Sequence, residues 1–255
     1  MGRYDYLRPT NKFMELEQFD WDVIPSLQEL YKPQPPVSRW DVARMKNSET
    51  RHDRCLRMLR QLSLTCKACT MCELGRRDAQ KDYIVRDPHV LSNLNPSRFV
   101  IVGQNPGWRE LELCEPFVGA SGDNFNKQVE KHGLSRDDFY ITNAVKCWTQ
   151  DNSKPNLQHA EACKPFLQME LQLLRPLLVI VLGASAFDMM CPNHKFSDRL
   201  QKITRDEVFP WPVYAAYHPS PMNMTNKGRK EAFEKQVAIL CKLVKKMKLE
   251  THYTE

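Results

Sequence analysis

The sequence of 255 residues contains no apolar run close to the roughly 20 residues that span a bilayer. Its opening segment, MGRYDYLRPTNK, lacks the hydrophobic stretch of a secretory signal peptide. Internal repeats and low-complexity tracts are absent too. The charge excess is modest, since 37 Lys and Arg against 31 Asp and Glu give a net charge of +6. We therefore expect a soluble, intracellular, monomeric protein, for which an anionic partner is compatible but not required.

The chain does have nine cysteines, which in a reducing compartment favour metal binding or free thiols over disulfides. Cys66, Cys69 and Cys72 form a C-x2-C-x2-C run, and Cys147 and Cys163 follow with fifteen residues between them. A zinc ribbon would supply two close pairs, whereas thiolates from separate elements suit a [4Fe–4S] cluster, which is larger than a single ion. Zinc and ordinary buried cysteines remain the alternatives. The other cysteines are expected to be packing residues: Cys55, Cys114, Cys191 and Cys241.

The pattern of apolar residues predicts an α/β domain. Residues 1–60 read as an N-terminal extension with a Pro-rich linker at 32–38, followed by a helix from Arg39 to about Leu64 that Ser38 caps. Residues 61–250 alternate strands with helices, which is typical of a parallel sheet covered on both faces, here with four strands. The predicted strands are 99–102, 139–142, 178–182 and 213–217, and the predicted helices are 121–133, 156–174, 184–191 and 226–249.

Three of the predicted strands end in unusual polar sequences. Gly103-Gln-Asn-Pro-Gly follows the first, Thr142-Asn143 ends the second, and His218-Pro-Ser-Pro-Met-Asn follows the fourth. Ligands of open parallel sheets bind outside the carboxyl ends of the strands, so these segments are expected to meet at one site.

Together these segments resemble the uracil-DNA glycosylase superfamily, and especially its iron–sulfur (family 4) members. The resemblance covers about residues 60 to 250, and its motifs come in the family's order. They are Cys69-x2-Cys72, Gly103-Gln-Asn-Pro-Gly, Pro116-Phe-Val-Gly, Thr142-Asn-Ala-Val-Lys-Cys147, Cys163 and His218-Pro-Ser-Pro. The family 4 loop has Glu and Ala where this chain has Gln104 and Asn105. A Gly-x-Asn-Pro-Gly loop is similar instead to the mismatch-specific and single-strand-selective uracil glycosylases.

The resemblance implies a monofunctional DNA glycosylase that removes uracil, or another pyrimidine, from DNA after flipping the nucleotide out. His218 would stabilise the departing uracil anion, and Asn105 would place the attacking water. No lysine lies in the catalytic loop, so lyase chemistry is not implied. The structural alternatives are a turn residue at Asn105 and a structural histidine at 218.

Further roles are implied by position. Asn143 would read the uracil edge, Phe117 would stack on the base unless it is a core residue, and Gln104 would contact the base. Ser220 and Pro221 would hold backbone phosphates, and Met222 would wedge into the vacated stack, with Met224 as its rival.

The ligands of the [4Fe–4S] cluster would be Cys69, Cys72, Cys147 and Cys163. Gly107 stands where the strictly uracil-specific branch has a tyrosine that excludes 5-substituted bases. A glycosylase for 5-substituted pyrimidines, or a non-catalytic relative that binds modified bases, is therefore the alternative function.

Overall fold

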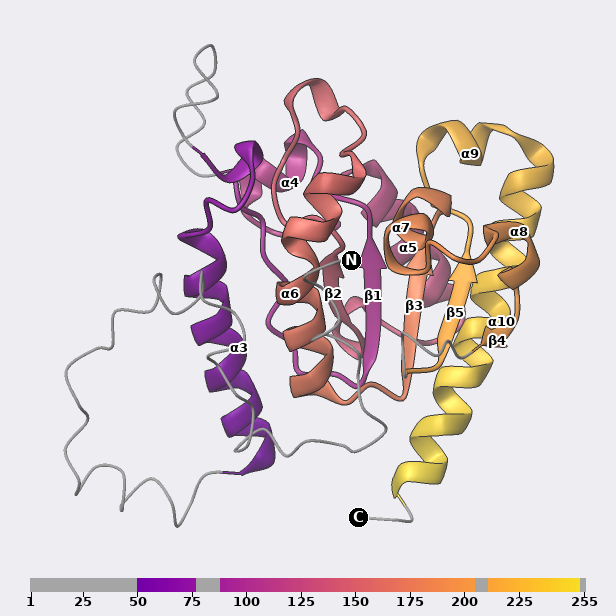
Figure 1. Ribbon diagram of the computed structural model, residues 1–255. Coiled ribbons are helices and arrows are strands. Elements are labelled where there is room, and N and C mark those ends of the chain that lie inside the picture. Colours follow the sequence, from indigo (N-terminus) through magenta and orange to yellow (C-terminus); the bar gives the residue numbers. More distant parts are fainter. Residues whose placement is uncertain (1–49, 77–87, 205–210, 253–255) are drawn as a thin grey trace.

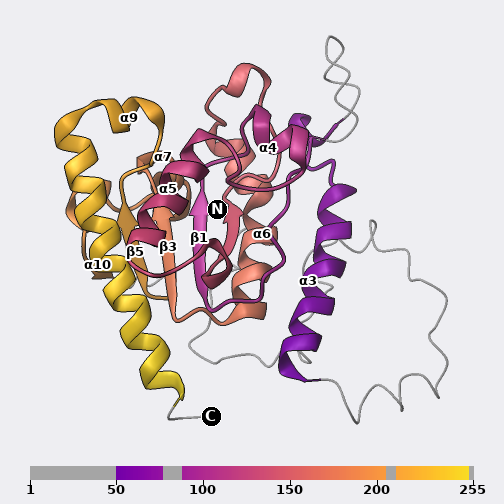
Figure 2. The same ribbon diagram turned by 180° about the vertical axis from the view of Figure 1, so that it is seen from behind.

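The computed structural model describes residues 50–76, 88–204 and 211–252. In this part of the chain, five strands form one sheet in the order β2-β1-β3-β5-β4, with helices on both faces (Figures 1 and 2). Strands β1 (Phe99–Gly103), β2 (Tyr140–Asn143), β3 (Leu178–Leu182) and β5 (Val213–Ala216) are parallel. The predicted four-stranded parallel sheet is thus confirmed. The sheet also has a short antiparallel edge strand, β4 (Ile203–Thr204), that was not predicted.

The parallel strands are apolar along most of their length because both faces of the sheet are covered. Alternate side chains point to opposite faces, as the period of a strand requires. Val100, Val102, Val179 and Val181 pack with α3 (Arg51–Lys67), α6 (Leu157–Leu174) and α7 (Ala184–Met190). Phe99, Ile101, Leu178 and Ile180 pack on the other face with α5 (Ala120–Lys131) and α10 (Lys227–His252).

Most predicted helices agree with the structure within two or three residues, and the differences have local causes. The helix predicted to start at Arg39 begins at Arg51, where Thr50 caps it through a reciprocal pair of hydrogen bonds with Asp53. Ser38, the Pro-rich linker and the N-terminal arm lie outside the described residues. The short helices were not predicted: α4 (Trp108–Leu113), α8 (Phe196–Arg199), α9 (Pro221–Thr225), and the 3-10 turns η4 (Glu73–Gly75), η6 (Arg136–Asp138) and η7 (Gln150–Asn152).

The register of the sheet places the ends of its strands together. Gly103 is paired with Asn143, and Leu182 is paired with Ala216, two residues before His218. The segments that follow β1, β2 and β5 therefore begin at the same edge of the sheet. None of the described helices is both long and apolar enough to cross a membrane.

Candidate active site and cysteine cluster

Gly103, Asn143 and Phe117 lie in close contact at the carboxyl end of the sheet. A Cβ atom at Gly103 would lie 2.4 Å from Asn143 Oδ1 and 2.4 Å from Phe117 Cε2, so no other residue fits there without displacing them. Asn143 is 2% exposed, and its Oδ1 atom has no hydrogen-bond partner. An unpaired buried acceptor is costly, and it is the kind of atom that a ligand satisfies.

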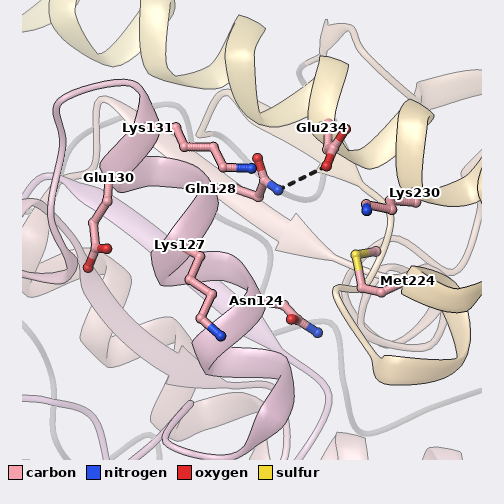
Figure 3. A pocket seen from close by; sticks show the side chains of 8 residues that line it. All are labelled: Asn124, Lys127, Gln128, Glu130, Lys131, Met224, Lys230 and Glu234. Atoms are coloured by element: carbon pink, nitrogen blue, oxygen red, sulfur yellow. Dashed lines mark hydrogen bonds between the residues drawn. The ribbon is translucent and has the colours of Figure 1, made fainter.

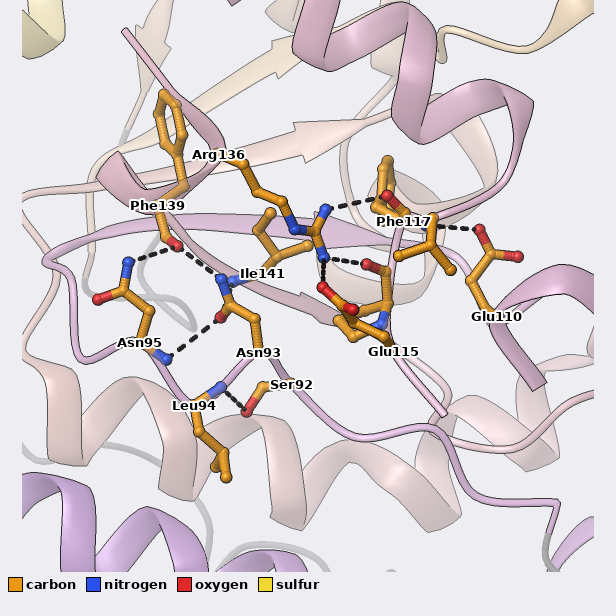
Figure 4. A network of polar contacts seen from close by, with 12 residues as sticks. Ser92, Asn93, Leu94, Asn95, Glu110, Glu115, Phe117, Arg136, Phe139 and Ile141 are labelled. Atoms are coloured by element: carbon orange, nitrogen blue, oxygen red, sulfur yellow. Dashed lines mark hydrogen bonds and ion pairs between the residues drawn. The ribbon is translucent and has the colours of Figure 1, made fainter. Parts of the chain in front are cut away.

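The backbone at Phe117 is strained, and two charged side chains hold it. Phe117 has φ +54°, which is uncommon for a residue with a side chain. Arg136 donates to the carbonyl oxygens of Phe117 (2.9 Å) and Pro116, as Figure 4 shows. On the far side, Glu110 Oε1 accepts from the backbone N–H groups of Val118 (3.1 Å) and Gly119 (2.8 Å). The Phe117 ring is buried, and these contacts fix its direction.

The loop after β1 turns the side chain of Asn105 toward Thr149. Asn105 Nδ2 donates to Thr149 Oγ1 (3.0 Å) and to the carbonyl oxygen of Pro106 (3.1 Å). Both amide hydrogens are therefore used, and Oδ1 remains as an acceptor. Gln104 lies next to it, and its carbonyl oxygen accepts from the N–H of Val145 (2.9 Å).

Gly107 faces Glu110 rather than Asn143. Its N–H donates to Glu110 Oε2 (3.1 Å), and a Cβ atom there would lie 2.8 Å from the same oxygen and 3.7 Å from Asn152 Oδ1. Its φ of −89° is accessible to any residue, so close approach and not a special turn favours glycine here. Glu110 thus joins the loop of Asn105 to the loop of Phe117.

The His218 ring lies next to the Phe117 ring, with ring centroids 6.1 Å apart and the planes at 53°. Burial lowers the pKa of His218 to about 4, and the negative charge of Glu110 opposes that shift only weakly. The imidazole is therefore neutral at pH 7 and can donate one N–H. Asn223 Nδ2 holds the carbonyl oxygen of His218 at 2.8 Å.

The remaining predicted DNA contacts lie on α9. Ser220 caps this helix by accepting from the N–H of Asn223, and Pro221 is its first residue. Met222 is 72% exposed, which suits a wedge better than the partly buried Met224 does.

A hollow of about 430 Å³ lies beside this helix, between α5 and the start of α10 (Figure 3). Lys127, Lys131 and Lys230 line it together with Glu130 and Glu234. Asn124, which also lines the hollow, donates to the carbonyl oxygen of Pro219 (3.0 Å), so the hollow adjoins the His218 loop.

Five cysteines gather where α3, the loop after β2 and α6 meet. They are Cys66, Cys69, Cys72, Cys147 and Cys163, and all but Cys72 are buried. Burial raises the pKa of Cys66, Cys69, Cys147 and Cys163, and neighbouring thiols of the group raise it further. A cationic centre would relieve this mutual repulsion, as in thiolate-ligated iron. Among the described His, Cys, Asp and Glu side chains, no three converge closely enough to hold a single metal ion.

Several residues of this site were not found from the sequence. Glu110 could have been predicted, because a Glu at the third position of a helix commonly accepts a hydrogen bond from the backbone N–H of the residue that precedes the helix. Arg136 and Thr149 give no such signal, since each acts on a segment that the fold brings near.

A profile of the uracil DNA glycosylase superfamily matches residues 91–241. A Type-4 uracil-DNA glycosylase of Thermotoga maritima is 30% identical over 174 residues, or 66% of this chain and 85% of that protein. The enzyme of the same name from Archaeoglobus fulgidus is 33% identical over 144 residues, covering 53% of this chain and 71% of its own. One from Pyrobaculum aerophilum is 42% identical over 84 residues, covering 33% and 43%.

Proposed function

This chain belongs to the uracil DNA glycosylase superfamily, and on that premise we propose that it removes uracil from DNA. As a DNA glycosylase it is a hydrolase: water adds to C1′ of the deoxyribose, the bond to the base nitrogen breaks, and an abasic site remains. The single observation that carries the choice of base is the buried, unpaired Oδ1 atom of Asn143.

Asn143 offers the donor and acceptor pattern that complements uracil. Its Oδ1 would accept from N3–H of uracil, and its Nδ2 would donate to O4. Cytosine presents an acceptor at N3 and a donor at the exocyclic amine, so it would leave both amide atoms of Asn143 unmatched. Phe117 would stack against the flipped base, and the lack of a side chain at Gly103 makes room for the Phe117 ring and the Asn143 amide.

His218 would stabilise the leaving group. Uracil departs with negative charge on O2, and a neutral imidazole can donate its N–H to that oxygen. The lowered pKa of His218 keeps it in this form. Glu110 would support the reaction indirectly, by fixing the loops that carry Asn105 and Phe117.

Asn105 would orient the attacking water. Its N–H groups are held by Thr149 and Pro106, which leaves Oδ1 to accept a hydrogen bond from that water. Water attacking an oxocarbenium-like sugar needs placement more than deprotonation, and a neutral amide suffices for that. Gln104 would contact the base from the same loop.

We propose that Cys69, Cys72, Cys147 and Cys163 hold a [4Fe–4S] cluster. Such a cluster would join α3, the loop after β2 and α6 into one unit behind the active site. Cys66, buried beside them, is left over in this assignment.

DNA would lie across the His218 loop and α9. Ser220 and Pro221 would contact phosphates, and the exposed Met222 would fill the gap that the flipped base leaves. Lys127, Lys131 and Lys230 would extend the phosphate contacts along the adjoining hollow. Exchanging all three for Gln should reduce the salt dependence of DNA binding by roughly two to three phosphate contacts.

The finer question is which pyrimidines the site accepts. Tolerance of groups at C5, such as hydroxymethyl, follows from the resemblance at position 107, whereas in the structure a Cβ atom there would meet Glu110. A tyrosine at position 107 would have to displace the Glu110 carboxylate, so Gly107→Tyr alone would confuse a lost wall with a disturbed loop. Gly107→Ser, which adds little bulk, is the control for that disturbance.

The experiment that tests the proposal is a panel assay. Single- and double-stranded oligonucleotides carrying uracil, 5-hydroxymethyluracil, cytosine or thymine are incubated with excess protein, and abasic sites are revealed by alkaline cleavage. Cleavage at uracil, with cytosine untouched, is expected, and Asn143→Ala should slow it strongly while leaving a measurable single-turnover rate. Binding without cleavage of any base would instead favour the non-catalytic alternative.

A further inference from the structure

Lys146 is a buried lysine in the turn that follows β2. Its side chain is 1% exposed. Its Nζ atom donates to Thr142 Oγ1 (2.6 Å), to the carbonyl oxygen of Asn143 (2.8 Å) and to Glu170 Oε2 (2.6 Å). Three acceptors match the three hydrogens of an ammonium group, so the group is fully satisfied.

The contact with Asn143 completes a turn that is held on two sides. From the β1 side, the carbonyl oxygens of Gly103 and Gln104 accept from the N–H groups of Ala144 (2.8 Å) and Val145 (2.9 Å). From the opposite side, Lys146 Nζ donates a hydrogen bond to the carbonyl oxygen of Asn143 (2.8 Å). The backbone of Asn143 is therefore fixed while its side-chain Oδ1 has no protein partner.

The same lysine adjoins the cysteine group. Its backbone N–H points to Cys163 Sγ at 3.5 Å, and Cys147 is the next residue along the chain. Glu170, its ion-pair partner, lies on the same helix as Cys163. Lys146 is thus in contact with the cysteine group through its backbone and with Asn143 through its side chain.

We infer that Lys146 is a positioning residue that aims the amide of Asn143 at the base. A buried ion pair is weak evidence of a stabilising role, because well-packed apolar residues commonly replace such pairs without loss. Three directed bonds, one of them to the backbone carbonyl of the residue that carries the unpaired acceptor, instead define an orientation. The inference rests on the proposed function, since it assigns Asn143 the task of reading uracil.

The test is a double-mutant cycle that removes both buried charges together. The double substitution Lys146→Met/Glu170→Gln keeps the side-chain volumes nearly unchanged and leaves no unpaired charge. Its effect is measured once in the protein with Asn143 and once in the Asn143→Ala variant. With Asn143 present, we expect a loss of roughly 10- to 100-fold in the single-turnover rate on uracil, with affinity for abasic DNA and iron content unchanged. In the Asn143→Ala background, the further loss should be below about threefold.

Thr142→Val is the matched control, because it removes one acceptor of Lys146 and leaves the contact with Asn143. It should stay within about threefold of the unaltered protein. Equal losses in both backgrounds would show that Lys146 supports the fold generally, and no loss in either would show that Asn143 is held without it. Both results overturn the inference.

A crystal structure of the Lys146→Met/Glu170→Gln protein provides a readout that does not depend on catalysis. We expect the Asn143 amide to be rotated or split between conformers, and an unchanged amide would overturn the inference. If this variant does not fold, Lys146→Gln, which retains a neutral donor, takes its place in the same cycle. An unaltered protein that leaves uracil in place would contradict the proposed function, while the crystal structure would still decide the role of Lys146.

Discussion

The rings of Phe117 and His218 face each other at 6.1 Å between centroids, with the planes tilted by 53°. They come from loops 101 residues apart in number, and the parallel sheet brings both to one edge. Under the proposed function, a base stacked on Phe117 and read by Asn143 would present its O2 to His218. Stacking and charge stabilisation would then act on the same ring.

The first prediction concerns that stacking. Phe117→Ala should slow uracil excision by about 10- to 100-fold, since stacking of a base on an aromatic ring contributes about 1–3 kcal/mol. Phe117→Tyr keeps the ring and should stay close to normal. Single-turnover rates measure this, and affinity for DNA that already contains an abasic site should not change. Equal rates for the Ala and Tyr variants would mean that the ring serves only the core.

The second prediction concerns water placement. Asn105→Ala should reduce the single-turnover rate by roughly 10²-fold with DNA affinity intact, because it removes an acceptor and no phosphate contact. Thr149→Val frees the amide that Thr149 holds at 3.0 Å, and it should produce a smaller loss in the same direction. Full activity of Asn105→Ala would assign the water to another group.

The third prediction concerns the protonation of His218. Its pKa of about 4 lies below the value near 6.5 of an unfolded chain. Between these values the unfolded state binds the proton and the folded state does not, so the free energy of unfolding should fall as pH drops from about 6.5 to about 4, by up to roughly 3 kcal/mol. Imidazole NMR signals of His218, assigned with His218→Gln, should remain those of the neutral ring down to about pH 5.5. Titration of the ring near pH 6.5 would contradict the assignment.

The fourth prediction concerns the cysteines. Protein purified without oxygen should be brown and carry about four iron and four sulfide per chain. Replacing Cys69, Cys72, Cys147 or Cys163 by Ser should reduce both the iron content and the melting temperature. Cys66→Ser, which alters an equally buried thiol of the same group, should be mild. If Cys66 proves essential and Cys72 dispensable, the first pair of ligands would be Cys66 and Cys69 instead of Cys69 and Cys72.

The sequence predicts most of the layered fold because the physical cause there is local. β3 has the predicted bounds, Leu178 to Leu182, and all five of its residues are buried. The α6 helix begins after Asn156, whose side chain caps it. The antiparallel β4 escapes prediction because two residues, one of them exposed, give no alternation to detect.

The site is predictable only where a residue follows a strand directly. Asn143 ends β2 and Asn105 lies two residues past β1, so their neighbourhood follows from the parallel sheet. Arg136 acts on carbonyls that lie 19 and 20 residues before it in the chain. Lys146 looks like a surface lysine in sequence, and only the folded helix α6 supplies the carboxylate that lets it be buried.

The unpaired Oδ1 atom of Asn143, which would serve uracil recognition under the proposed function, lowers the thermal stability of the free protein. A buried acceptor without a donor costs about 1–3 kcal/mol while no base is bound, and an apolar residue of similar shape would recover part of it. Under the proposed function, a variant that gains stability by losing this amide would also lose the means of telling uracil from cytosine. Under the proposed function, the nucleotide would supply the missing hydrogen bond, so the cost borne by the free protein would be recovered in the bound state.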